Sequence, residues 1–179
     1  MKKMIRLKWT KNITLFGKYA LLLFGLIWAE CAVAQQLTIA KAVGNEISIT
    51  EDTAVLSKAL TLTVKDGSRF DTLYVISHQK RHYLVGIGTY RNMQKTIAVE
   101  LFYHIQTRTY QAKTGLGYVT CTSAACSTCD LFLEHGKIIG CKCSEKSTIS
   151  NQCNFTQVQT ADFYRSIVRA KQILLKNKP

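Results

Sequence analysis

KTIAVELFYHI, which runs from Lys95 to Ile105, places apolar or aromatic residues at every second position. A β-strand has a two-residue period, so this pattern sets one face of a strand in a core and leaves the other face more polar. The apolar face carries Ile97, Val99, Leu101, Tyr103 and Ile105, whereas Thr96, Ala98, Glu100 and His104 point the other way. We therefore predict a long strand with one buried face.

Three further β-branched and aromatic runs lie on either side of this strand, separated by short polar joints. They are LYVIS (Leu73–Ser77), HYLVGIGTY (His82–Tyr90) and RTYQAKTGLGYVT (Arg108–Thr120). Parallel strands need a crossover of a dozen or more residues, which these joints do not provide. The runs therefore predict a four-stranded antiparallel meander.

Two helices are expected, one before these strands and one at the C-terminus. After a short strand at Glu46–Ile49, Thr50 can cap a brief helix over Glu51–Leu60. Residues Ala161–Lys176 have a helical period, with an apolar side that we expect to cover the sheet. The apolar side is formed by Phe163, Ile167, Ala170 and Leu174, and the opposite ridge by Arg165, Arg169 and Lys176. This basic ridge predicts contact with an anionic surface.

The first 34 residues have the pattern of a cleavable signal peptide. Six basic residues precede the uncharged run ALLLFGLIWA (Ala20–Ala29), which is too short to span a bilayer comfortably. Ala32-Val33-Ala34 then predicts cleavage between Ala34 and Gln35. An uncleaved anchor and lipidation of Cys31 are the alternatives. We expect an exported protein that resides in the periplasm, on the cell surface or in the medium, with no membrane span after cleavage.

Residues 35–179 are expected to form a single α+β domain. Without the leader, the chain keeps 18 basic and 10 acidic residues, a net charge of +8 rather than the +13 of the whole sequence. Such a charge attracts anionic partners without specifying one, and an exported protein seldom meets nucleic acid. We therefore expect a solvated basic surface and no nucleic-acid partner, and the partner itself is unknown.

Six of the seven cysteines lie in one module, residues 121–153, with the pattern C-x4-C-x2-C-x11-C-x-C-x9-C. Between its two halves, LFLEHGKIIG predicts a hairpin that turns at His135-Gly136-Lys137. This hairpin would bring the two halves together, with the outermost cysteines outside the inner pairs. The fold class is thus α+β: the meander, a short N-terminal helix, a C-terminal amphipathic helix on the sheet, and a small Cys-rich hairpin module.

Disulfides are the simplest use of these thiols. An even number of cysteines in an exported chain allows three bridges, with 15 connectivities. Cys141 and Cys143 do not pair with each other, because residues two apart on a strand hold their Cβ atoms roughly 7 Å apart, beyond the ~4 Å of a disulfide. The candidate residues are Cys121, Cys126, Cys129, Cys141, Cys143 and Cys153.

Zinc is a second interpretation of the module. A structural zinc site needs four thiolates at about 2.3 Å from one ion, and two close cysteine pairs joined by a hairpin can supply them. The four ligands would be Cys126, Cys129, Cys141 and Cys143.

CTSAACSTC, from Cys121 to Cys129, also resembles the cluster loop of plant-type 2Fe–2S ferredoxins. That loop has C-x4-C-x2-C spacing with small residues around the second cysteine, where this chain has Ala124 and Ser127. The match covers nine residues of 179. The resemblance implies an electron carrier with Cys121, Cys126, Cys129 and Cys153 as iron ligands.

The sequence favours a binding or structural component over an enzyme, because no nucleophile, base and orienting group occur together in it. A metal-centre protein, with zinc or a 2Fe–2S cluster, is the alternative. A cysteine-dependent oxidoreductase is a third class, although a thioredoxin-like site would place Cys126 at the start of a helix rather than before a hairpin. In the preferred interpretation there is no cofactor.

Overall fold

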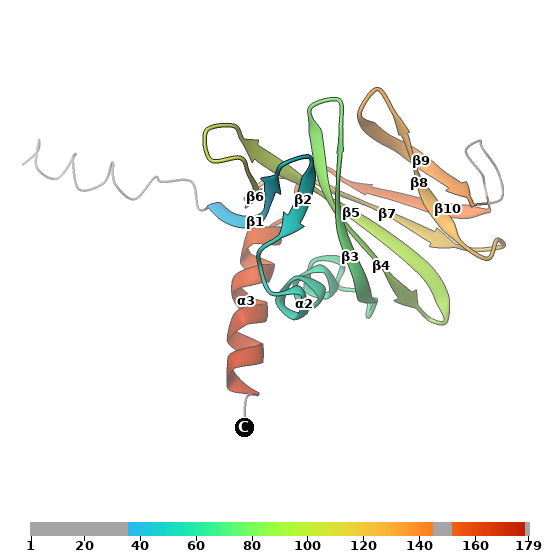
Figure 1. Ribbon diagram of the computed structural model, residues 1–179. Coiled ribbons are helices and arrows are strands. Elements are labelled where there is room, and N and C mark those ends of the chain that lie inside the picture. Colours follow the sequence, from blue (N-terminus) through green and yellow to red (C-terminus); the bar gives the residue numbers. More distant parts are fainter. Residues whose placement is uncertain (1–35, 145–151, 178–179) are drawn as a thin grey trace, which may run out of the picture. The chain divides into compact units, whose positions relative to one another are not determined.

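The computed structural model describes residues 36–144 and 152–177. In these ranges, strands outnumber helices, and the helices lie on one side of the main sheet (Figure 1). The elements are β1 (Gln36–Val43), β2 (Glu46–Ile49), α2 (Thr53–Val64), β3 (Arg69–His78), β4 (Arg81–Tyr90), β5 (Met93–His104), β6 (Thr109–Lys113), β7 (Tyr118–Ser123), β8 (Cys129–Glu134), β9 (Lys137–Cys143), β10 (Cys153–Val158) and α3 (Phe163–Lys176). The predicted cleavage site lies outside the described residues.

Strand β5 is the centre of an antiparallel sheet of eight strands. One edge of β5 pairs with β4, which pairs in turn with β3, and the other edge pairs with both β7 and β6. Strands β1 and β2 extend the sheet beyond β6, and β10 extends it beyond β7. The sheet is therefore larger than the predicted four-stranded meander, and it curls towards a barrel. The antiparallel pairing of successive strands is confirmed.

The predicted strand Arg108–Thr120 is two strands. Phe102 on β5 pairs with Gln111 of β6, and Val99 on β5 pairs with Tyr118 of β7. Three residues along β5 thus correspond to seven residues along the partner segment from β6 to β7. Four residues therefore loop out between β6 and β7. Gly115 lies in this loop with φ +82°, and a Cβ at Gly117 would meet the backbone oxygen of Val158 at 2.5 Å. These glycines interrupt the strand and let β10 approach closely.

The alternation along β5 separates two cores. Ile97, Val99 and Leu101 face α2 and α3 in the larger core, as the pattern predicts. Ala98 faces the opposite side, where it packs under the hairpin formed by β8 and β9. The prediction that Ile105 belongs to the buried face is wrong, because Ile105 lies beyond the end of β5 with 76% of its surface exposed.

Both helices occur, with different starts from those predicted. Asp52 caps α2, because its Oδ1 accepts a hydrogen bond from the Ala54 amide at 2.8 Å, so Thr50 is not the cap. Glu51 lies before α2 rather than in its first turn, and it forms an ion pair in which its Oε2 lies 2.7 Å from Nζ of Lys171 on α3. Asp162 caps α3, whose Phe163, Ile167 and Ala170 are buried against the sheet and α2.

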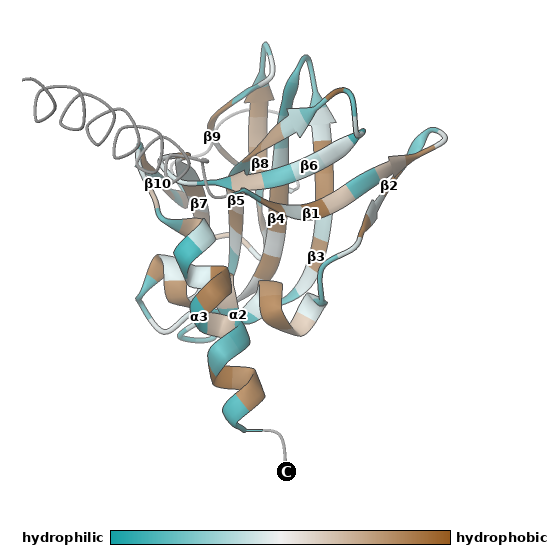
Figure 2. Ribbon diagram, turned by 90° about the vertical axis from the view of Figure 1, so that its left-hand side faces the viewer, coloured by the Kyte–Doolittle hydropathy of each residue, from teal (hydrophilic) through white to brown (hydrophobic). Residues whose placement is uncertain are grey.

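Strands β1 and β10 were not predicted. Strand β1 supplies Ile39 and Ala40 to the larger core, and β10 forms an edge of the sheet beside the cysteines. Figure 2 shows hydrophilic and hydrophobic segments following one another along α3. None of the helices in the ranges 36–144 and 152–177 has the length and hydropathy needed to cross a membrane.

Candidate binding groove and cysteine module

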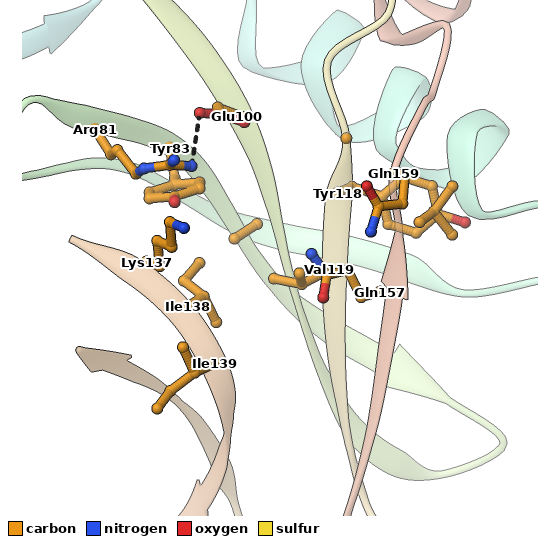
Figure 3. Close-up of a pocket in the computed structure, with 13 residues that line it drawn as sticks. Arg81, Tyr83, Glu100, Tyr118, Val119, Lys137, Ile138, Ile139, Gln157 and Gln159 are labelled. Atoms are coloured by element: carbon orange, nitrogen blue, oxygen red, sulfur yellow. Dashed lines mark hydrogen bonds and ion pairs between the residues drawn. The ribbon is translucent and has the colours of Figure 1, made fainter. Parts of the chain in front are cut away.

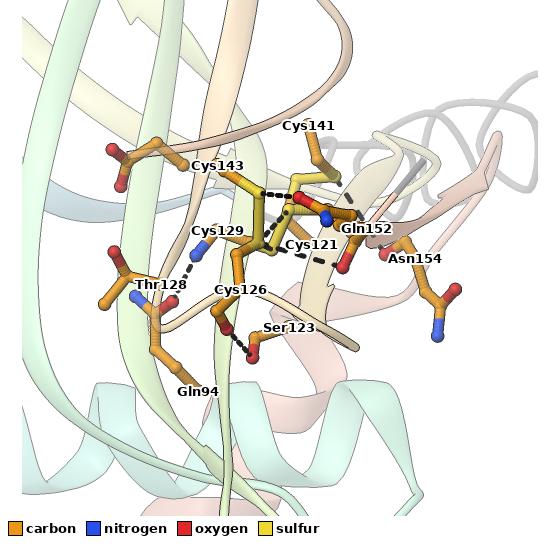
Figure 4. The surroundings of a disulfide bond; sticks show 12 residues. Gln94, Cys121, Ser123, Cys126, Thr128, Cys129, Cys141, Cys143, Gln152 and Asn154 are labelled. Atoms are coloured by element: carbon orange, nitrogen blue, oxygen red, sulfur yellow. Dashed lines mark hydrogen bonds between the residues drawn. A yellow bond between two sulfur atoms is a disulfide. The ribbon is translucent and has the colours of Figure 1, made fainter. Parts of the chain in front are cut away.

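The six module cysteines form three disulfides, whose surroundings Figure 4 shows. They join Cys121 to Cys141, Cys126 to Cys143, and Cys129 to Cys153, with Cα–Cα separations of 5.7, 5.9 and 5.9 Å. These separations lie in the ordinary range for disulfides. Cys141 and Cys143 bond to different partners. The bridges are compatible with an oxidising location outside the cytoplasm.

The bridges attach the base of the β8–β9 hairpin to one end of the main sheet. Cys121 on β7 holds the end of β9, and Cys153 on β10 holds the start of β8. Cys126, in the loop before β8, holds the last residue of β9. The hairpin sets Cys129 opposite Cys143, and the flanking Cys121 and Cys153 bond to its cysteines because the hairpin lies across the sheet and meets β7 and β10.

The tip of the hairpin is held to β4, at the end of the hairpin away from the disulfides. His135 and Gly136 form the turn, with φ angles of +47° and +78°, as the predicted turn at His135-Gly136-Lys137 requires. The Tyr83 hydroxyl donates a hydrogen bond of 3.2 Å to the carbonyl oxygen of Gly136. Near the base, Thr96 Oγ1 donates to the carbonyl oxygen of Cys129 at 3.1 Å.

An apolar layer lies between the hairpin and the sheet. Ile138 of β9 is buried there against the sheet, and Leu131 and Leu133 of β8 are partly buried beside it. The sheet residues of this layer are Tyr83, Val85, Ala98 and Val119. The hairpin thus covers the face of the sheet that the helices leave open.

A groove of about 530 Å³ opens between β9 and β10 (Figure 3). Its floor is formed by residues of β4, β5 and β7, one wall by Lys137–Ile139, and the other wall by Gln157–Gln159. At the disulfide end the two walls meet through adjacent bridges: Cys143 of β9 bonds to Cys126, whose sulfur lies 3.3 Å from that of Cys153 on β10. The volume is within the range of small-ligand sites.

Charged side chains lie at the end of the groove away from the disulfides. Arg81 Nη1 lies 3.3 Å from Glu100 Oε1, and both side chains are about one-third exposed, so this pair is partly screened by water. Lys137 lies near them on the β9 wall (Figure 3) and makes no ion pair with a residue that the structure describes. Burial raises the pKa of the Tyr83 hydroxyl; a hydrogen bond with Arg81 lowers it and the Glu100 carboxylate raises it, and the net rise keeps the hydroxyl neutral.

The strands that border the groove have unpaired edges. Within the described ranges, β10 pairs only with β7, and β9 pairs only with β8. Ala124 donates its amide hydrogen to the carbonyl of Gln152, so alternate residues from Gln152 onward turn their backbone groups towards β7. Gln157 lies between two such residues, so its backbone N–H and C=O point away from β7, towards the free edge.

The sulfurs of two bridges are in contact. Cys126 Sγ lies 3.2 Å from Cys129 Sγ and 3.3 Å from Cys153 Sγ, and the three sulfurs lie within 4.8 Å of one another. This group contains three members of the predicted iron set, without Cys121, and two members of the predicted zinc set. Whether any of these sulfurs binds a metal stays a prediction.

Sequence reasoning did not find the groove. Arg81, Glu100 and Lys137 come from three different strands, and nothing in their local pattern brings them together. The basic ridge of α3 is found where expected: Arg165 is exposed and forms an ion pair with Asp162 at 2.9 Å. Contact of this helix with an anionic surface stays a prediction.

Comparison of the chain with protein-family models, with curated proteins and with solved structures finds no match. Functional inference therefore rests on the groove and the cysteine module.

The disulfide pattern can be tested directly by mass mapping. Digestion of the purified protein without reductant is expected to yield peptides that link Cys121 to Cys141, Cys126 to Cys143, and Cys129 to Cys153. Alkylation before digestion prevents exchange during the work-up. A peptide that links Cys126 directly to Cys129 would contradict the structure.

Proposed function

We propose that this protein is an exported binding protein, not an enzyme, and that the groove between β9 and β10 takes an extended peptide carrying a carboxylate. The observation that carries the proposal is the pair of strand edges on either side of one groove, neither of which pairs with another strand of residues 36–144 and 152–177. The disulfides serve this function as a support, because they fix the position of β9 against the sheet.

Backbone pairing is the first part of the proposed recognition. An exposed strand edge presents N–H and C=O groups that an extended peptide can pair with, which gives affinity with little dependence on sequence. Gln157 offers such groups on β10, and Lys137–Ile139 line the facing wall. A peptide between the walls would continue the curled sheet from β10 towards β9.

Charge and apolar contact are the second part. Lys137 faces the groove without an ion-pair partner among the described residues, while the charge of Arg81 is balanced by Glu100. The charged end of the groove thus has a surplus of one positive charge, which favours a carboxylate on the peptide. Ile139, which is 40% exposed, offers an apolar contact beside it.

Export is the third part of the proposal. Three disulfides in one module are compatible with an oxidising compartment, and the leader over residues 1–34 has the pattern of a signal peptide.

A metal-centre protein is the alternative function, and the contact among the sulfurs of Cys126, Cys129 and Cys153 is the observation that favours it.

A peptide library tests the groove. The disulfide-bonded protein is used to select from a phage-displayed library of random peptides long enough to form a strand. We expect the selected peptides to contain an acidic residue within a β-branched or aromatic pattern. Lys137→Glu should weaken their binding at least about tenfold, because it places a like charge beside the peptide carboxylate.

Two further variants complete the test. Lys41→Glu makes the same charge change on the exposed surface of β1, outside the groove, and should leave binding unchanged. Gln157→Pro removes an N–H from the free edge without removing one from the β7 ladder, and it should also weaken binding. Selection of no peptide, or of peptides whose binding survives both Lys137→Glu and Gln157→Pro, would contradict the proposal.

Export is tested on the full-length chain. We expect the protein to be recovered outside the cytoplasm with an intact mass that corresponds to a chain beginning at Gln35. Leu22→Arg places a charge in the apolar run of the leader and should retain the uncleaved chain inside the cell. Recovery of the wild-type chain only as the intracellular, full-length form would refute export.

A further inference from the structure

We propose that the reduced cysteine module binds one zinc ion through the thiolates of Cys126, Cys129, Cys143 and Cys153. This set differs from both ligand sets expected from the sequence, and the proposal does not depend on the groove. The cysteine module would then have two exclusive states, one with disulfides and one with zinc.

The four sulfurs belong to two bridges that touch. Cys126 Sγ is bonded to Cys143 and also lies 3.2 and 3.3 Å from the two sulfurs of the neighbouring bridge, Cys129 and Cys153. In a tetrahedral site with Zn–S distances of about 2.3 Å, ligand sulfurs are about 3.8 Å apart. The contacts between the bridges are therefore already close to the spacing of a metal site.

Reduction of the two bridges lets their bonded sulfurs move apart to the sulfur–sulfur distance of a zinc site. Each bridge has a Cα–Cα distance of 5.9 Å, so side-chain rotation can move its two sulfurs apart without a large change in the backbone. Cys126 lies in the loop before β8 and Cys129 begins β8, while Cys143 ends β9 and Cys153 begins β10. Figure 4 shows Cys126, Cys129 and Cys143 gathered at one end of the hairpin.

The surroundings suit thiolate ligands. The side-chain amide of Gln152 lies 3.3 Å from Cys143 Sγ, and with its nitrogen turned to the sulfur it would donate a hydrogen bond to the thiolate. The backbone around the other ligands is already fixed: the Cys129 amide donates to Gln94 Oε1 at 2.6 Å, and Ser123 Oγ donates to the Cys126 carbonyl at 2.7 Å.

The third bridge packs against this set but is not bonded to it. Cys121 and Cys141 bond to each other between β7 and β9, and their sulfurs lie outside the group within 4.8 Å; Cys143 also lies outside that group but is bonded to one of its members, Cys126. Removing this bridge should leave the four ligands intact. It therefore provides a matched control in which two cysteines are lost but the proposed site is not.

The chemistry balances with a dithiol reductant. Each disulfide takes two electrons and two protons from one dithiol, which becomes a cyclic disulfide, and opening two bridges gives four thiols. Zinc then displaces the thiol protons and binds as Zn²⁺ without a change of oxidation state. Bound thiolates are no longer free to form disulfides, so the two states of the cysteine module exclude each other.

Cobalt and zinc titrations test the proposal. The full purified protein is reduced with a dithiol, separated from the reductant without oxygen, and titrated with Co²⁺, whose absorption bands report tetrahedral sulfur ligation. We expect one Co²⁺ per chain, displaced by one Zn²⁺, and no binding by the disulfide-bonded protein. Metal analysis after gel filtration checks the stoichiometry.

Paired variants locate the ligands. Cys121→Ser with Cys141→Ser should keep one metal per chain, whereas Cys129→Ser with Cys153→Ser should weaken binding at least about 100-fold, with circular dichroism reporting the fold of each. No binding by the reduced wild-type protein would overturn the proposal, as would loss of binding in the Cys121 and Cys141 variant alone. Failure of peptide selection at the groove would leave these results unchanged, so the two proposals fail separately.

Discussion

The covalent attachment of one hairpin to one end of the sheet is the constraint on which the second face of this protein depends. The helices cover one face of the sheet, where Ile97, Val99 and Leu101 are buried. The other face carries Tyr83, Val85 and Val119, which would be exposed without the β8–β9 hairpin. Because β8 and β9 pair only with each other in the described ranges, their position relative to the sheet is set by side-chain contacts and by the three disulfides.

The weak packing of the hairpin on the sheet explains why covalent links are needed to hold it there. An isolated two-stranded hairpin is marginally stable in water, and outside the cysteines this hairpin contributes only one buried hydrophobic side chain to the layer beneath it, that of Ile138. Each bridge closes a loop with a sequence separation between 17 and 24 residues, which corresponds to about 3 kcal/mol of stabilisation in the chain-entropy model. The groove between β9 and β10 is a consequence of this attachment, because the Cys129–Cys153 bridge holds the hairpin to β10 only where β10 begins.

Local pattern predicted the parts of the fold that local physics determines. The alternation in Lys95–Ile105, the turn at His135–Lys137 and the apolar side of α3 all follow from a single period or turn preference, and the structure contains them. Strands β1 and β10 were missed because their stability comes from pairing with distant strands, β6 and β7. The same limit applies to the site: the cysteines were visible as candidates, but their pairing and the meeting of Arg81, Glu100 and Lys137 depend on how the hairpin crosses the sheet.

Amide hydrogen exchange of the metal-free protein, measured with the disulfides intact and after their reduction, tests the central role of the bridges most directly. The account predicts that reduction greatly increases exchange throughout β8 and β9, while β3, β4 and β5 keep their protection because the helix-covered core remains. Unchanged protection of β8 and β9 after complete reduction would show that packing alone holds the hairpin, and would contradict the account.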